Sequence, residues 1–120
     1  MDTQQIFDKA VNGVIKQGGP SLDKNGYCSY RGKDNKCCAA GHIIDDKYYK
    51  KDIEGRSSHN DDVVHAIERS IGRPLASREF TMIGQLQCAH DDMKRGSSLA
   101  CFRSDALQIA EDFKLSTKTL

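Results

Sequence analysis

Apolar residues recur at the spacing of an α-helix in several stretches of this sequence, and that periodicity constrains the fold more than any other feature. The clearest stripe lies near the C-terminus, where the apolar positions are Leu99, Phe102, Ala106, Ile109 and Phe113. These positions fall at i, i+3, i+7, i+10 and i+14, so they share one face of a helix. The stripe therefore predicts a C-terminal helix with a single buried face.

Other stretches carry the start and stop signals of helices as well as the periodicity. Asp2 or Thr3 can cap an N-terminal helix, which Gly18 and Pro20 would end. Asp45 and Asp46 place negative charge in a first helical turn, so they favour the start of a further helix there. The remaining predicted helices cover residues 45–53, 61–71 and 77–95. The sequence thus predicts four to five helices.

The segment between the first two predicted helices has a different pattern. Tyr27–Arg31 and Lys36–Ala40 are short β-like runs on either side of a turn rich in Gly, Asp and Asn. Two such runs around such a turn are typical of a β-hairpin. We therefore expect an α+β fold, mostly helical, with one small hairpin, built as a single domain over residues 1–120.

Length, composition and charge exclude several classes of protein. A chain of 120 residues fits one domain, and 38% hydrophobic with 29% charged residues is typical of neither a disordered tail nor a membrane protein. We find no apolar run that could span a bilayer and no secretory signal, and we expect a cytoplasmic protein. Residues 1–60 carry 10 basic and 8 acidic side chains, and residues 61–120 carry 8 and 9, so neither half is strongly basic. This balance lowers the expectation of nucleic-acid binding without removing it.

The five cysteines are an odd number, which favours reduced thiols over a disulfide framework. Structural zinc needs four thiolate or imidazole ligands around a tetrahedron. The alternative zinc set is Cys28, Cys38 (or Cys37) and His42, with His90, His59, His65 or Cys88 as the fourth ligand. The spacing is irregular for such a site, and small buried cysteines would explain the same residues.

A thiol enzyme is a related alternative. Its nucleophile would be Cys38 or Cys37, with His90 as the base and Asp91 or Asp92 orienting the imidazole. A histidine on the flank of an apolar stripe is more often a hydrogen-bonded core residue, and only the residue types support catalysis. No nucleotide-binding loop or other catalytic motif accompanies them, and we expect no cofactor.

Aromatic and basic residues gather in two stretches that could form a contact surface. Tyrosine and arginine are common interface anchors, and they also stack on nucleic-acid bases. The predicted binding residues are Tyr27, Tyr30, Arg31, Lys33, Lys36, Tyr48 and Tyr49. An ordinary hairpin and helix surface would explain each stretch separately.

A specific pattern of residues covers about residues 27–55. It runs Tyr30-Arg31-Gly32, then Cys38-Ala39-Ala40-Gly41-His42-Ile43-Ile44, Asp46, Tyr49 and Glu54-Gly55. It resembles a group of small phage and prophage proteins with no established activity. The sequence departs from the group at Asp45, where the pattern usually has proline. The resemblance implies a viral accessory context, and it offers no reaction to transfer.

Small phage accessory proteins most often bind a host protein. The leading hypothesis is therefore a binding module without enzymatic activity whose partner is a host or defence-system protein. One form would be an anti-CRISPR or similar inhibitor of bacterial defence. The alternatives are a small zinc- or thiol-dependent enzyme centred on Cys38, His42 and His90, and a nucleic-acid-binding accessory protein. Monomer and homodimer both stay open.

Overall fold

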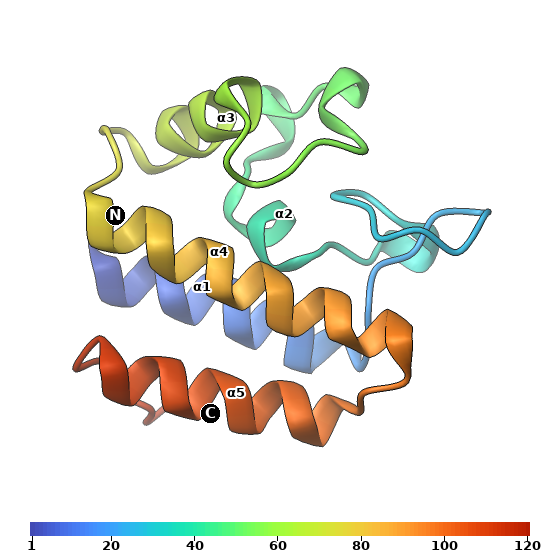
Figure 1. The fold of residues 1–120 in the computed structure, drawn as a ribbon. Helices are drawn as coiled ribbons and strands as arrows, with labels where there is room; N and C mark the ends of the chain where they lie inside the picture. Colours follow the sequence, from blue (N-terminus) through green and yellow to red (C-terminus); the bar gives the residue numbers. More distant parts are fainter.

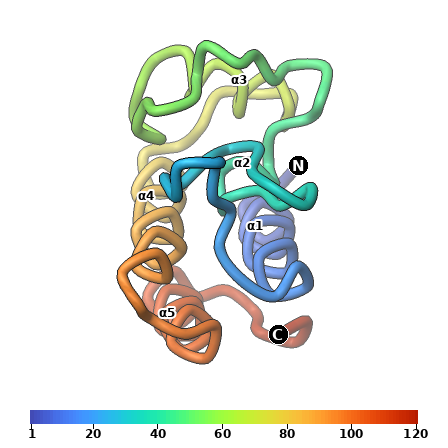
Figure 2. The backbone as a smooth tube through the Cα atoms, turned by 90° about the vertical axis from the view of Figure 1, so that its right-hand side faces the viewer, coloured from blue at the N-terminus to red at the C-terminus, as the bar shows by residue number.

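Three long helices form the base of the molecule in the computed structural model, which describes all residues 1–120. They are α1 (Thr3–Gln17), α4 (Ser77–Asp92) and α5 (Leu99–Asp112). They lie side by side in Figure 1, with α5 running opposite to the other two, and Figure 2 shows the three helices roughly end-on. Residues 19–76 cover one side of this three-helix layer.

The ends of the long helices follow the signals in the sequence. Asp2 caps α1 with its side chain, and Gln5 completes a capping box. Gly18 ends α1 in the left-handed conformation, with φ of 87°. Ser98 caps α5 by accepting a hydrogen bond from the amide of Cys101. The helix predictions for these regions are confirmed.

The core lies where the three helices meet the covering segment. Its largest fully buried hydrophobic side chains are Phe7, Phe102, Ile6, Ile43, Ile67, Met82 and Leu86. They come from α1, α4, α5, α3 (Asp61–Ile71) and the short helix α2 (Ala39–Ile43), so a single core joins both parts of the chain. None of the helices combines the length and the apolar character that crossing a membrane requires.

The covering segment contains only short elements and one medium helix. It runs through the 3₁₀ turn η1 (Lys33–Asn35), α2 (Ala39–Ile43), the turns η2 (Asp46–Tyr48) and η3 (Lys51–Ile53), and α3 (Asp61–Ile71). Helix α2 packs against both α1 and α4. A last 3₁₀ turn, η4 (Met93–Arg95), extends α4.

The predicted β-hairpin is wrong, and with it the α+β fold class, because the protein is all-helical. The single β feature is an isolated bridge between Leu22 and Cys28. Residues 27–31 do not pair with residues 36–40, because the amides of Tyr30 and Arg31 donate to the carboxylate of Glu54. The expected second strand instead turns into α2, in line with the good helix propensity of alanine.

The helix expected over residues 45–53 is also absent as a continuous α-helix. The two 3₁₀ turns η2 and η3 take its place, separated by extended backbone at Tyr49 and Lys50. The expected helix over residues 61–71 is present as α3, which Asn60 caps and Gly72 ends.

Candidate functional site: an acidic cleft beside α4 and α5

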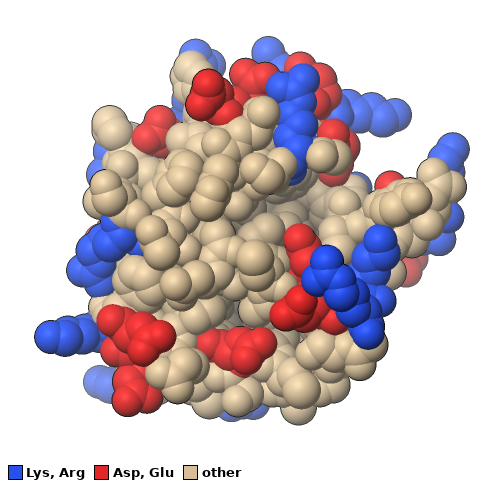
Figure 3. All heavy atoms as spheres, viewed as in Figure 1, with Lys and Arg blue, Asp and Glu red and all other residues tan.

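A cleft of about 1040 Å³ opens on one face of the molecule. Figure 3 shows this face, hollowed above α4 and bordered by acidic side chains over α5 and the end of α4. Two loop segments, residues 28–30 and 55–59, form its other sides. The volume is at the upper end of the range for small-molecule sites, about 300–1,000 Å³. The cleft is open, and only 6 of its 21 lining residues are hydrophobic, which suits part of a macromolecule.

Carboxylates outnumber cations in the cleft. The charged residues that line it are Asp91, Asp92, Asp105, Asp112 and Arg56. The Arg56 guanidinium lies 2.6 Å from the carboxylate of Asp62, which is outside the cleft. Asp92 is paired with a surface arginine at 3.0 Å, whereas Asp105 and Asp112 take part in no ion pair. The cleft therefore has negative charge that the chain itself does not neutralise.

His59 forms part of the wall opposite α5. Its ring stacks on Phe80, with ring centroids 4.4 Å apart. A Cβ atom at Gly84 would lie 2.7 Å from Nε2 of His59, so the glycine of α4 leaves the space that the imidazole occupies. This close approach explains a glycine within a helix, where it costs about 1 kcal/mol relative to alanine. His59 is exposed and can meet a bound partner.

Glu54 joins the two loops that form the cleft wall. Its Oε1 accepts hydrogen bonds from the Ser29 hydroxyl at 3.0 Å and the Tyr30 amide at 2.9 Å. Its Oε2 accepts from the Arg31 amide at 3.0 Å and the Tyr49 hydroxyl at 2.7 Å. Because Glu54 directly precedes the 55–59 loop, its four bonds fix that loop to residues 28–30.

Arg31 ties the same region to the end of α2. Its guanidinium donates to the carbonyls of Gly41 at 2.7 Å and Ile44 at 2.8 Å, which α2 leaves without helical partners. It also contacts Asp46 at 3.1 Å and lies 4.8 Å from the ring centre of Tyr49. The tyrosine, arginine and glutamate of the phage-like pattern thus have structural roles here.

Asp91 is the polar centre of the cleft floor. Its Oδ1 accepts from His90 Nδ1 at 2.8 Å and from Gln87 Nε2 at 3.3 Å. The thiol of Cys28 is a third neighbour, and the ligand atoms of Cys28, His90 and Asp91 all lie within 4.8 Å of one another. Among the residues proposed for zinc, only Cys28 and His90 belong to this group.

The hydrogen bonds of His90 oppose metal binding at this group. The amide of Ser21 donates to His90 Nε2 at 2.9 Å, so Nε2 carries a lone pair and the proton of the neutral ring sits on Nδ1. That proton points at Asp91, on the side where a metal would bind. Binding a metal at Nδ1 would require an imidazolate or the loss of the Ser21 hydrogen bond to the fully buried His90 ring.

The thiols lack the features of a catalytic nucleophile. Burial and the nearby Asp91 carboxylate raise the pKa of Cys28 to about 11. Burial raises the pKa of Cys38 to about 12, and its sulfur caps α2 by accepting from the Gly41 amide. Both therefore stay protonated at neutral pH, whereas nucleophilic cysteines need a lowered pKa.

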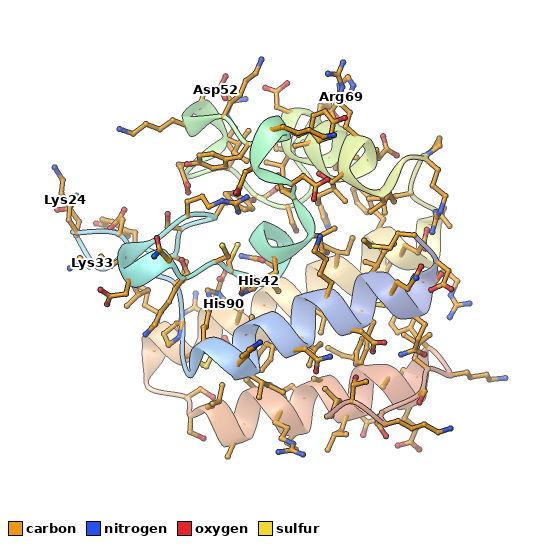
Figure 4. The ribbon with its side chains drawn as sticks, turned by 180° about the vertical axis from the view of Figure 1, so that it is seen from behind. Lys24, Lys33, His42, Asp52, Arg69 and His90 are labelled. Carbon is orange, nitrogen blue, oxygen red and sulfur yellow. The ribbon has the colours of Figure 1, made fainter.

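His42 is placed apart from this group, on α2 against α1. Figure 4 labels it together with His90, which lies on α4. Its Nε2 lies 2.8 Å from Oε1 of Gln17, and a Cβ atom at Gly13 would meet the ring at 2.4 Å. Burial, with a smaller contribution from the Arg31 charge, lowers the pKa of His42 to about 4. The ring is a neutral packing group at physiological pH.

The seven predicted binding residues are divided among different environments. Tyr30 is 4% exposed, with its hydroxyl donating to the Arg56 carbonyl, and Arg31 and Tyr49 hold the structure as described above. Tyr27 is 62% exposed beneath the ammonium of Lys94.

The other predicted residues lie farther from the cleft. Lys33 is exposed at the projecting end of a loop, near Lys24 in Figure 4. Lys36 is half-buried. Tyr48 lines a separate notch of about 300 Å³ with Arg69. The prediction of binding residues therefore included one residue that lines the cleft, Tyr30, and missed the acids of α5.

The acids of α5 were missed because nothing in the sequence distinguishes them from an ordinary solvated face. Their only signal is a shared spacing, since Asp105, Gln108 and Asp112 fall on one side of the helix, away from the apolar stripe.

Comparison with known proteins gives no family for this chain. No protein-family model, no curated protein and no solved structure matches it.

Proposed function

We propose that this protein is a non-enzymatic binding module that docks part of a host protein in the acidic cleft. The observation that carries the proposal is the cleft itself, a large open recess whose walls are fixed by Glu54 and in which Asp105 and Asp112 take part in no ion pair. A preformed surface of this kind reduces the ordering cost of binding.

The chemistry of the site supports binding over catalysis. A thiol enzyme needs an imidazole that accepts the thiol proton. Here the accepting nitrogen of His90 is occupied by the Ser21 amide, and its other nitrogen donates to Asp91. The cysteine beside it has a raised pKa.

The nature of the partner follows from the resemblance to phage and prophage proteins. Accessory proteins of that kind act in the cytoplasm of the bacterial host, and inhibition of a defence system, as by an anti-CRISPR, is a typical role. We propose that setting for this protein. Nucleic acid is not favoured as the occupant, because the cleft carboxylates would repel phosphates.

Site-specific photo-crosslinking in the bacterial host tests the proposal. A photoreactive residue would replace Gln108, which lines the cleft, and in a control would replace Leu107, which is 41% exposed on α5 and does not line it. We expect one host protein to be captured from position 108 and not from position 107. Capture only from position 107, or of nucleic acid from position 108, would contradict the proposal.

A further inference from the structure

We infer that the cleft recognises a basic segment of its partner, with two Lys or Arg side chains bound by Asp105 and Asp112. The inference rests on the proposed function and adds the chemistry of the occupant. It follows from the charge, the spacing and the helix position of these two acids, taken together with the shape of the cleft.

The spacing of the two acids sets the spacing of the partner's cations. Asp105 and Asp112 are separated by seven positions on α5 (112 − 105), which is about 10 Å at ~1.5 Å per residue. Both line the cleft and both are exposed. Two cations about 10 Å apart on one face would be three residues apart in a polyproline II segment, which rises ~3.1 Å per residue and has three residues per turn.

The position of Asp112 is unfavourable for α5 alone. It is the last residue of the helix, next to Glu111, and the last turn contains no basic residue. Negative charge at the C-terminal end opposes the helix dipole, typically by about 0.3–1 kcal/mol. A cation bound there would offset this cost, so a local conflict in the free chain would be resolved in the complex.

The opposite wall leaves room for the cations. Arg56 is the one basic residue lining the cleft, and its contact with Asp62 directs it toward α3. The exposed His59 ring, fixed over Gly84 and Phe80, provides a flat face for a guanidinium or an aliphatic stem. An acidic or phosphorylated segment would meet repulsion on the α5 side.

Peptide binding to the full chain tests the inference. The probe is a fluorescent peptide with two arginines three positions apart, and its matched control carries citrulline, the neutral isostere of arginine. The variant is Asp105→Asn with Asp112→Asn. Its control is Asp34→Asn with Asp52→Asn, which removes the same charge from exposed positions outside the cleft.

We expect fluorescence anisotropy to show that the wild-type protein binds the arginine peptide more tightly than the citrulline peptide, and that added salt weakens this binding. In the cleft variant, the affinity for the arginine peptide should fall about tenfold. The control variant should bind as the wild type does. Equal binding of the two peptides, or equal loss in the two variants, would overturn the inference. The cleft variant can also carry the photoreactive residue at position 108. If it still captures the same host protein at wild-type yield, the proposed binding function stands and recognition of a basic segment is excluded.

Discussion

The three-helix layer and the first part of the covering segment, residues 19–60, reach stability by different means. In the layer, α1, α4 and α5 bury apolar stripes against one another, with Phe7, Leu86 and Phe102 fully buried. The segment contains five residues of α-helix, and polar side chains hold most of it, with Glu54 and Arg31 satisfying its backbone groups. Apolar packing is distributed over many contacts, whereas a polar network depends on single groups.

Each region has one glutamate that shows the difference. Glu79, at the start of α4, is 1% exposed and binds Arg73, Thr3 and the Ala76 amide. It fixes one end of a helix layer that packing also holds. Glu54 binds Ser29 and Tyr30 in one loop of the cleft wall and directly precedes the other loop, so its removal should act on the cleft wall.

The largest effect is expected in the layer. Phe102→Ala would remove a fully buried ring from α5 and lower the free energy of unfolding by about 4 kcal/mol. Urea unfolding, followed by circular dichroism, measures this loss. The whole molecule should unfold together, because one core joins both regions. A separate early transition of residues 19–60 would contradict this.

A somewhat smaller and more local effect is expected from Glu54→Gln. The change weakens four hydrogen bonds, including those from the Tyr30 and Arg31 amides, and should cost about 2–3 kcal/mol. Hydrogen exchange should speed up at residues 28–31 and 55–59 and stay slow in α1 and α4. Uniform acceleration across all helices would show that Glu54 is not specific to the covering segment.

The pH dependence of stability should separate the two regions. The folded pKa of His42 is lowered to about 4 from 6.5, so the unfolded chain binds the proton first and stability falls between about pH 6.5 and 4. The Arg73 hydrogen bond lowers the pKa of Glu79 to about 2 from 4.5, so its contribution, present above pH 4.5, is lost down to about pH 2.

We expect each of these pH-dependent contributions to amount to about 2–3 kcal/mol. Urea midpoints measured across pH check this. His42→Gln should remove the change in stability between about pH 6.5 and 4, and Glu79→Gln should remove the change between about pH 4.5 and 2. If either variant removed both pH-dependent changes in stability, or neither of them, the assignment of these changes to His42 and Glu79 would be contradicted.

The smallest effect on stability is expected for Gly84→Ala, and Gly13→Ala is its counterpart. Both glycines face a histidine ring, but His42 is packed and His59 is exposed. Gly13→Ala should destabilise in spite of the helix preference for alanine, whereas Gly84→Ala should change stability by about 0–1 kcal/mol and displace His59. Thermal unfolding and the chemical shifts of the His59 ring measure the two outcomes. A destabilisation by Gly84→Ala equal to that of Gly13→Ala would contradict it.

The sequence predicted the layer well, because the determinants of α1 and α5 are local. Asp2, Gly18 and Ser98 act within one turn of the helices that they bound, and the apolar spacing of α5 can be read without its neighbours. The α3 helix was also predicted, since Asn60 and Gly72 mark its ends.

Residues 19–60 of the covering segment were predicted poorly because their determinants lie far apart in the chain. Tyr30 and Arg31 bond to Glu54 more than twenty residues away, and Ser21 bonds to His90 69 residues away. Those bonds remove the amides that a hairpin would use. The cleft shares this property, since its walls come from residues 28–30, 55–59, α4 and α5, which no local pattern connects.

Partner capture by the two glutamate variants tests the central claim most directly. The photoreactive residue at position 108 would be combined with Glu54→Gln or with Glu79→Gln, at a pH and temperature at which circular dichroism shows both variants folded. Glu54 joins two parts of the cleft wall, while Glu79 does not line the cleft. We predict that capture falls about tenfold with Glu54→Gln and is retained with Glu79→Gln. Equal capture by the two variants would contradict the claim that the Glu54-bound segment forms the binding site.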